Sequence, residues 1–393
     1  MKDNKRILSI DIFRGLTILV MIFVNDLASV KGLAWWTYHI PYGADGLTYV
    51  DIVYPAFLFI VGMSIPIAIE KRLNTGLSKL QLIKHILIRT ISLAIIGLLI
   101  MNGRAMSPEM TGISYALWNV LMFIGVLLLW NVYPKNLEGK NKYVQYLKWL
   151  GLSLLVILLF IYRRDVDGVS HWIHPRNWSI LGGIAFAYLS VCIIYLINRN
   201  IWYLLLVFIA LICLKIGAVE EFITFPRKLH PIIWPFGTGS TAAITLCGLL
   251  SSLIFVGNKF GESVRNKMIA GISFTIILAI AGYLLLPFGL SKISGTPSWS
   301  LLSSMYSLLA FMILFLLVDV YHKSKWANFI KPAGSNPLLT YLLPDIFYAI
   351  FTVQWLSEST GEGLSGVIRA LIFTLFILGW SALMTNYKIR LQM

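Results

Sequence analysis

The polar side chains between residues 25 and 51 are of the types that acid–base catalysis uses. His39 lies between Asn25 and Asp26 on one side and Asp51 on the other. A neutral histidine can take a proton or attack a carbonyl, and a neighbouring acid or amide can orient its ring. One interpretation is therefore a base with its orienting partners. The alternatives are a solvated loop histidine and, for Asp51, an acid that stabilises the start of a helix.

A charged pair, Asp11 and Arg14, precedes this group in the chain. Residues three apart share one face of a helix. The pair forms either a salt bridge at the membrane surface or an anion site for a phosphorylated or CoA-like substrate. Trp35 and Trp36 follow in the loop that contains the histidine. They either anchor the chain at the membrane interface or form an apolar wall against a sugar ring or a lipid.

A third polar group lies late in the chain, in the segment SNPLLTYLLPD. It contains Asn336 and Asp345, and each is next to a proline that leaves backbone carbonyls without a helical partner. Such a segment either lines a site or forms a structural kink. The sequence leaves both interpretations open.

Composition places these groups in a membrane protein. Of the 393 residues, 58% are apolar and 12% are charged, about half of the ~25% typical of soluble domains. The net charge of +15 is explained by lysine and arginine in cytoplasmic loops, and no basic stripe on a soluble module indicates nucleic-acid binding. The three cysteines lack the spacing of metal ligands, so no metal site is predicted.

Apolar runs long enough to cross a bilayer recur along the whole chain. They predict an all-α transmembrane bundle of about 12 helices, treated as a single domain over residues 1–393. The expected spans are 12–30, 51–70, 82–102, 113–133, 147–163, 178–197, 201–217, 238–256, 267–287, 299–320, 335–353 and 363–385.

The loop charges predict the orientation of these helices. The loops after the even-numbered spans are richer in lysine and arginine than the others, so both termini are expected in the cytoplasm and His39 outside it. The prediction depends on a tight turn at 198–200, because without that turn every later helix would be inverted.

Two motifs at the start of the chain resemble a known family. SIDIFRGLTILVMIFVND, a short aromatic loop with His39, and DGLTYVDIVYPAFLFIVGMSI follow one another in this order. They resemble the heparan-alpha-glucosaminide N-acetyltransferase family and its bacterial relatives, the DUF5009 and YeiB-like transmembrane acyltransferases. GTGSTAAITLCG, WSLLSSMYSLLAF and GSNPLLTYLLPDIFY are fainter matches later in the chain.

The resemblance implies an enzyme that passes an acetyl group from cytoplasmic acetyl-CoA to the amine of a glucosamine on the far side of the membrane. The catalytic residues that match the family are His39, Asn25 and Asp51. The expected CoA-binding residues are Arg14, Asp11 and Asn336. The expected substrate-binding residues are Trp35, Trp36, Asp26 and Asp345.

The sequence also departs from the family pattern. Trp118–Asn119 stands where the family has a Gln-Arg pair, and Pro344–Asp345 stands where it has His-Glu. Residues 178–217 form an extra hairpin, and the large luminal insert is absent, which argues against heparan as the substrate. A transporter of amino sugars or muropeptide-derived sugars is therefore the alternative to the acyltransferase, and a non-catalytic membrane scaffold is the third.

The expected partners are membrane lipid and an amino sugar or glycan, in a bacterial inner membrane. No nucleic acid is expected, and a homodimer stays open beside a monomer. Neither the acceptor nor the choice between direct transfer and an acetyl-histidine is determined by the sequence.

Overall fold

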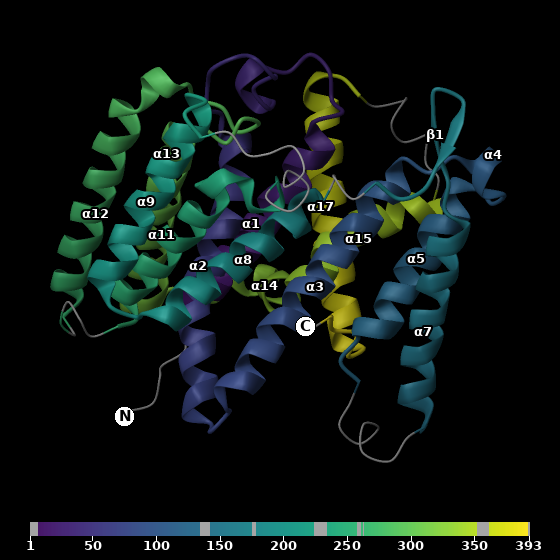
Figure 1. The fold of residues 1–393 in the computed structure, drawn as a ribbon, viewed down its shortest axis with the longest axis horizontal. Coiled ribbons are helices and arrows are strands. Elements are labelled where there is room, and N and C mark those ends of the chain that lie inside the picture. The colour runs from purple at the N-terminus through teal and green to yellow at the C-terminus, as the bar shows by residue number, and fades with distance from the viewer. Residues whose placement is uncertain are drawn as a thin grey trace.

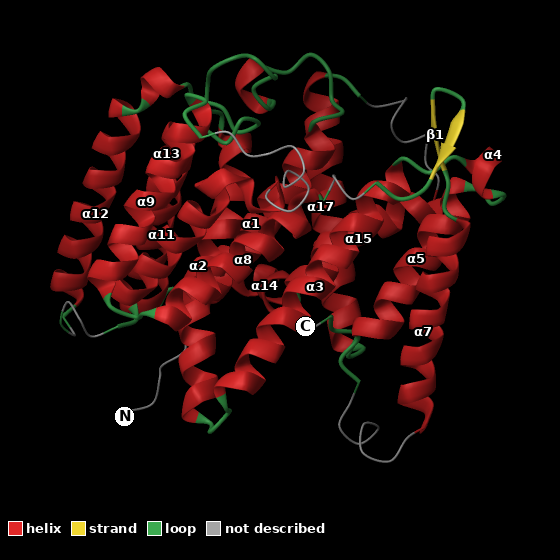
Figure 2. Ribbon diagram, viewed as in Figure 1, coloured by secondary structure: helices red, strands yellow, loops and turns green. Residues whose placement is uncertain are grey.

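The computed structural model describes residues 7–133, 142–174, 178–223, 234–257, 261, 263–351 and 361–391. Helices dominate these residues, and a two-stranded hairpin is the one sheet found among them (Figure 2). The prediction of an all-α membrane bundle is confirmed.

Nine helices in the described residues are long and apolar enough to cross a membrane (Figure 1). They are α1 Leu8–Leu27, α2 Tyr49–Asn74, α3 Lys79–Arg104, α7 Lys142–Ile161, α8 Ser179–Ile197, α9 Ile201–Val219, α12 Val264–Leu284, α13 Pro297–Leu314 with its π-helical continuation η4 Phe315–Val320, and α17 Gly363–Asn386.

Three shorter apolar helices bring the total in the described residues to twelve, and each has a counterpart among the predicted spans. They are α5 Tyr115–Trp130, α11 Ser240–Phe255 and α15 Pro337–Phe351. The tight turn at 198–200 is also present, because α8 ends at Ile197 and α9 begins at Ile201. The first helix begins four residues earlier than expected, so Asp11 and Arg14 both lie within α1.

Short elements connect the helices at the two ends of the bundle. They are η1 Trp35–Thr37, α4 Pro108–Thr111, η2 Trp234–Gly239, η3 Leu286–Phe288, η5 Lys325–Ile330, α14 Lys331–Ser335, and the antiparallel strands β1 Arg164–Val166 and β2 Val169–His171. The loop after α1 and the β-hairpin lie at one end of the bundle, at the top of Figure 1. We call this end the His39 face; the loop charges predict that it is extracytoplasmic.

The centre of the bundle is the crossing of α2 and α11. The two helices approach closely because each has a glycine where its partner passes: Gly62 on α2 and Gly248 on α11. A Cβ on Gly62 would lie 1.7 Å from the carbonyl oxygen of Thr245, and one on Gly248 would lie 1.9 Å from that of Phe59. Small residues let membrane helices approach this closely. The crossing fixes α2, which carries residues of both polar sites described below.

The start of α1 is held by a carboxylate from a distant helix. Asp319 in η4 accepts hydrogen bonds from the backbone N–H groups of Leu8 and Ser9, at 3.0 and 3.2 Å. The first N–H groups of a helix have no partner within the helix, and a negative charge there is favourable. This contact fixes the position of the helix that carries Arg14.

Candidate active site

Asp51 joins the loop after α1 to the start of α2. Its Oδ1 lies 2.7 Å from Nδ1 of His39. Its Oδ2 accepts hydrogen bonds from the backbone N–H groups of Ile40 and Thr48, both at 3.3 Å. The hydroxyl of Thr48 lies 3.0 Å from the same oxygen. The carboxylate therefore stabilises the first turn of α2 and orients the histidine at the same time.

This contact determines which nitrogen of His39 is free to react. An ionised carboxylate only accepts hydrogen bonds, so the proton of a neutral imidazole sits on Nδ1 and the lone pair on Nε2. The Asp51 side chain is 1% exposed, whereas the His39 side chain is 43% exposed. A buried acid thus holds an accessible base, the arrangement that general-base and nucleophilic catalysis both use.

Aromatic side chains lie beside the pair. Trp35, Trp36 and Tyr42 are exposed on the same loop. The ring of Trp36 packs against Tyr49 at the start of α2, with centroids 6.1 Å apart. An exposed aromatic surface next to a base suits a ligand with an apolar ring face, and it equally suits the membrane interface.

A second loop, residues 289–296 between α12 and α13, meets the His39 loop. The N–H of Leu290 donates to Asp45 at 2.8 Å, and its carbonyl accepts from Gly46 at 2.9 Å. Lys292 in this loop reaches His39, with Nζ 3.2 Å from Nδ1 and 3.4 Å from Nε2. Sequence reasoning counted Lys292 only as a loop charge, because nothing in the pattern links it to a residue 253 positions away.

The environment of Lys292 opposes its charge. Its side chain is 25% exposed and its Nζ lies 4.0 Å from Oδ1 of Asp51. Burial lowers the pKa of Lys292 below the usual lysine value, and attraction to Asp51 offsets only part of that shift. A lysine that has lost part of its hydration donates strong hydrogen bonds to any anion that forms nearby.

Asn25 and Asp26 are not joined to this pair. Asn25 is exposed on α1 and has no hydrogen bond to His39 in the part of the chain that the structure describes. Asp26 is buried, with Oδ2 3.4 Å from Nη2 of Arg369 and a short hydrogen bond from the hydroxyl of Tyr348. Its carboxylate therefore links α1 to α15 and α17, and its predicted role in substrate binding stays a prediction.

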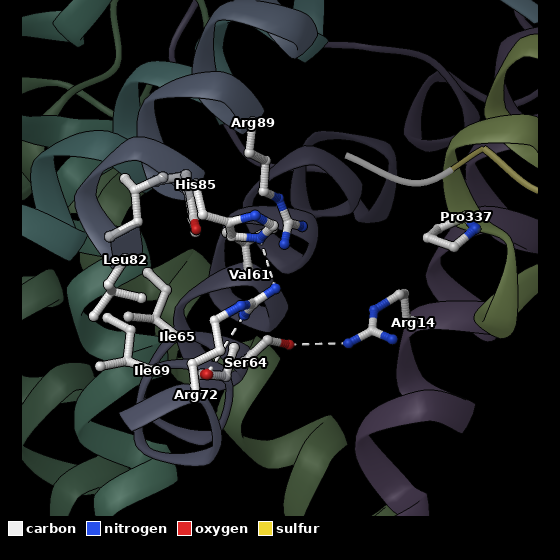
Figure 3. Close-up of a pocket in the computed structure, with 13 residues that line it drawn as sticks. Arg14, Val61, Ser64, Ile65, Ile69, Arg72, Leu82, His85, Arg89 and Pro337 are labelled. Carbon is white, nitrogen blue, oxygen red and sulfur yellow. Dashed lines mark hydrogen bonds between the residues drawn. The ribbon is translucent and has the colours of Figure 1, made fainter. Parts of the chain in front are cut away.

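A cavity of about 210 Å³ lies on the side of the bundle away from His39, among α1, α2 and α3. Among the described residues, its lining carries four basic side chains and no acid (Figure 3). They are Arg14, Arg72, His85 and Arg89. A cluster of guanidinium groups with little exposure to water binds anions, phosphates above all. The volume suits a phosphate-sized group, because a whole drug-sized ligand needs about 300–1,000 Å³.

The contacts around the cavity hold its arginines in place. Arg14 contacts Asp11 at 3.1 Å and donates to Oγ of Ser64 at 2.9 Å. Arg72 Nη2 lies 2.6 Å from Nε2 of His85. The sequence indicated Arg14 and Asp11, but it missed the other three basic groups. His85 and Arg89 are four apart on α3, a spacing that places them on one helix face and could have revealed them.

Arg89 lies one helical turn further along α3 than His85. Its guanidinium carbon lies 4.9 Å from the ring centroid of Tyr188 on α8. A cation over an aromatic ring is stabilised without an acidic partner. The ring of Tyr188 therefore helps to keep the charge of Arg89 at the cavity.

The late polar residues are used elsewhere. Asn336 is buried, and its amide donates to Oγ1 of Thr385 and the carbonyl of Ile389 and accepts from the N–H of Leu391. These three bonds leave it little capacity for a cofactor, so its predicted CoA contact is not part of the proposal below. Asp345 lies 3.1 Å from Nη2 of Arg104 on α3.

The fold and these two sites define a class of protein: a polytopic helical membrane protein with a histidine–aspartate pair at one face and a cavity lined by basic side chains toward the other. Residues 6–234, more than half of the chain, match the model of the family described as Domain of unknown function (DUF5009), and the chain belongs to that family.

Two curated proteins are similar to part of the chain. Over 121 residues it is 35% identical to heparan-alpha-glucosaminide N-acetyltransferase of Mus musculus and 34% identical to the protein of the same name from Homo sapiens. The resemblance seen in the motifs is thereby confirmed. The match covers 31% of this chain and 18% of each relative, so it spans less than a fifth of their length.

Proposed function

We propose that this protein is a membrane N-acetyltransferase. It transfers an acetyl group from acetyl-CoA bound from the cytoplasm to the amine of an amino sugar or glycan on the His39 face, in a bacterial inner membrane. The observation that carries the proposal is the contact between His39 and the buried carboxylate of Asp51 at 2.7 Å. The name of the curated relatives supports the reaction class.

The chemistry assigned to His39 follows from the lone pair on its unprotonated Nε2. The attacking amine forms a C–N bond to the thioester carbonyl, and its proton passes to Nε2. The C–S bond then breaks, and the proton returns to the leaving thiolate. Asp51 stabilises the imidazolium that exists between these steps, and a base of this kind contributes about 10²–10⁴-fold to a rate. Attack by Nε2 itself, with an acetyl-histidine intermediate, uses the same geometry.

The arginine cavity is assigned to the phosphates of the donor. It lies along α2 from Asp51, because Ser64 in its lining is thirteen residues further along that helix, which corresponds to about 20 Å at 1.5 Å per residue. A donor held there by phosphates must reach His39 through a long flexible arm, and CoA has such an arm. The small volume of the cavity leaves the rest of the donor outside it.

The aromatic surface next to His39 supports the proposal that the acceptor is a sugar. Trp36 packs on Tyr49 and keeps one face exposed beside the loop of His39. Planar aromatic rings pack against the apolar faces of sugar rings, and the exposed Nε2 can accept the proton of an amine bound there.

The test is a CoA-release assay on purified protein in lipid nanodiscs, with labelled acetyl-CoA and glucosamine. We expect acetylglucosamine and free CoA in equal amounts. His39→Ala should lower kcat at least about 100-fold while acetyl-CoA binding stays within about twofold. His171→Ala, which changes an exposed histidine in the hairpin on the same face, is the matched control. CoA release that is equal in wild type and His39→Ala would overturn the proposal, and sugar accumulation in vesicles without CoA would support the transporter instead.

A further inference from the structure

The loop of residues 289–296 brings a cation to the reactive nitrogen of the histidine. Nζ of Lys292 lies 3.4 Å from Nε2 of His39 and 3.2 Å from Nδ1. Because the proton on Nδ1 points to Asp51, only Nε2 has a lone pair that can accept a hydrogen bond from the ammonium group. The ammonium group of Lys292 therefore lies within hydrogen-bond distance of the atom at which the proposed reaction occurs.

The backbone holds this lysine from both sides. Before it, Leu290 is hydrogen-bonded to Asp45 and Gly46 of the His39 loop. After it, the carbonyl of Ser294 accepts a hydrogen bond from Nζ of Lys215 at 2.8 Å. Lys215 is buried on α9, so the hairpin formed by α8 and α9 contributes to the position of this loop. A cation with a fixed position needs no reorganisation when charge develops beside it.

The ion pair between Lys292 and Asp51 is a long one. The distance from Nζ to Oδ1 of Asp51 is 4.0 Å, and that carboxylate has His39, Ile40 and Thr48 as closer partners. Burial lowers the pKa of Lys292 despite the nearby acid. The fold therefore keeps a partly dehydrated ammonium group in place, attracted by Asp51 and closer to the ring of His39 than to that carboxylate.

We propose that Lys292 is a further catalytic residue, which stabilises the oxyanion formed on the acetyl carbonyl beside Nε2 of His39. This inference rests on the proposed function. When the amine attacks, the carbonyl oxygen takes the electron pair of the double bond. It returns the pair when the C–S bond breaks. Lys292 keeps its proton throughout and donates hydrogen bonds to that oxygen. The same oxyanion forms if Nε2 attacks first, so the role is common to both routes.

The proposal predicts how activity depends on alkaline pH. Among the described residues, the titratable groups that interact with Lys292 are His39 and Asp51. Two further charged groups bind the backbone of its loop: Asp45 at Leu290 and Lys215 at Ser294. Lys292 must be protonated to act, and its pKa lies below the usual lysine value of about 10.4 because of burial. Activity should therefore fall as Lys292 loses its proton, at a lower pH than for a solvated lysine.

Two variants and one control test the role in the CoA-release assay. Lys292→Met removes the charge and should lower kcat about 100-fold, the usual effect of losing one oxyanion donor, with KM for acetyl-CoA changed less than about threefold. Lys292→Arg keeps its charge over the whole alkaline range of the assay, so it should retain activity within about tenfold and lose the alkaline decline. Lys31→Met changes an exposed lysine on the same face and should match wild type.

A second readout does not depend on acetyl transfer. It is the rate at which diethyl pyrocarbonate modifies His39 at one fixed neutral pH, followed by mass spectrometry. Modification of Nε2 places positive charge on the ring, and the ammonium group 3.4 Å away opposes that charge, so the rate should rise about threefold or more in Lys292→Met. If Lys292→Met does not fold, the activity of Lys292→Arg measured against alkaline pH tests the role of Lys292 instead.

The outcomes separate this inference from the function on which it rests. Wild type that releases no CoA overturns both. Two results with an active wild type overturn the role of Lys292 alone. One is a Lys292→Met variant as active as wild type. The other is a Lys292→Arg variant whose activity falls at alkaline pH just as that of wild type does. An unchanged rate of modification in Lys292→Met shows that Lys292 and His39 do not interact in the folded protein, and it also overturns the role.

Discussion

The two polar sites of this protein are built in different ways. The His39 site is assembled from two loops fixed to the start of α2 by one buried carboxylate, Asp51. The arginine cavity is assembled from helix faces, and no acid is found in its lining in the part of the chain that the structure describes. The first arrangement orients a single reactive nitrogen, whereas the second accumulates positive charge. The difference suggests that one site performs chemistry and the other provides binding energy.

Both sites share α2, and this makes the comparison testable. Changes at Asp51 should affect the rate of the chemical step, and changes at Arg72 should affect donor affinity, although the two residues belong to the same helix. A variant that changed both quantities equally would indicate one continuous site or a general loss of structure.

The largest effect is expected for Asp51→Asn. The amide can still accept hydrogen bonds at the start of α2, but its NH₂ group toward His39 favours the tautomer with the proton on Nε2, which removes the lone pair needed for catalysis. We expect kcat to fall about 10²–10⁴-fold and acetyl-CoA affinity to change little, measured by CoA release and by equilibrium binding.

The control for this variant is Asp165→Asn. Asp165 lies in the β-hairpin on the same face and accepts a hydrogen bond from Gly168 at 2.8 Å. It should behave as wild type in both assays. A kcat for Asp51→Asn within tenfold of wild type would show that the carboxylate does not orient the base, and the assignment of chemistry to the His39 face would then be wrong.

A smaller effect is expected for Arg72→Gln. A hydrogen bond to a charged group contributes about 1.5–3 kcal/mol, so loss of this guanidinium should weaken acetyl-CoA binding about 10-fold or more while kcat at saturation stays within about twofold. Lys71→Gln makes the same charge change at the neighbouring exposed residue and is the matched control. Equal weakening in both variants would mean that net charge, and not the cavity, attracts the donor.

The sequence predicted the architecture because membrane spans are visible as long apolar runs. All twelve predicted segments have a helical counterpart in the described residues. It also brought His39 and Asp51 into one neighbourhood, because adjacent antiparallel helices place the end of one span near the start of the next. These features depend on local composition or on short separations along the chain.

The remaining site residues could not be identified from the sequence, for physical reasons. Asn25 and Asp26 are consecutive, so they point about 100° apart on a helix, and packing turned Asp26 inward. Lys292 contacts His39 although 253 positions separate them in the chain. Helix packing brings the two residues together, so no sequence pattern predicts their contact. Arg72 was interpreted only as a cytoplasmic charge, because loop statistics say nothing about which side of a helix faces a cavity.

The most direct test of the account measures on which side of a membrane the product forms. Protein is reconstituted in sealed vesicles in one orientation, with acetyl-CoA on the side of the arginine cavity and glucosamine on the His39 face. We predict that acetylglucosamine forms only in the glucosamine compartment and that His39→Ala abolishes it. The contrary result is product that forms only when glucosamine and acetyl-CoA are both on the side of the arginine cavity. It would contradict the proposal that the donor binds at one end of α2 and the reaction occurs at the other.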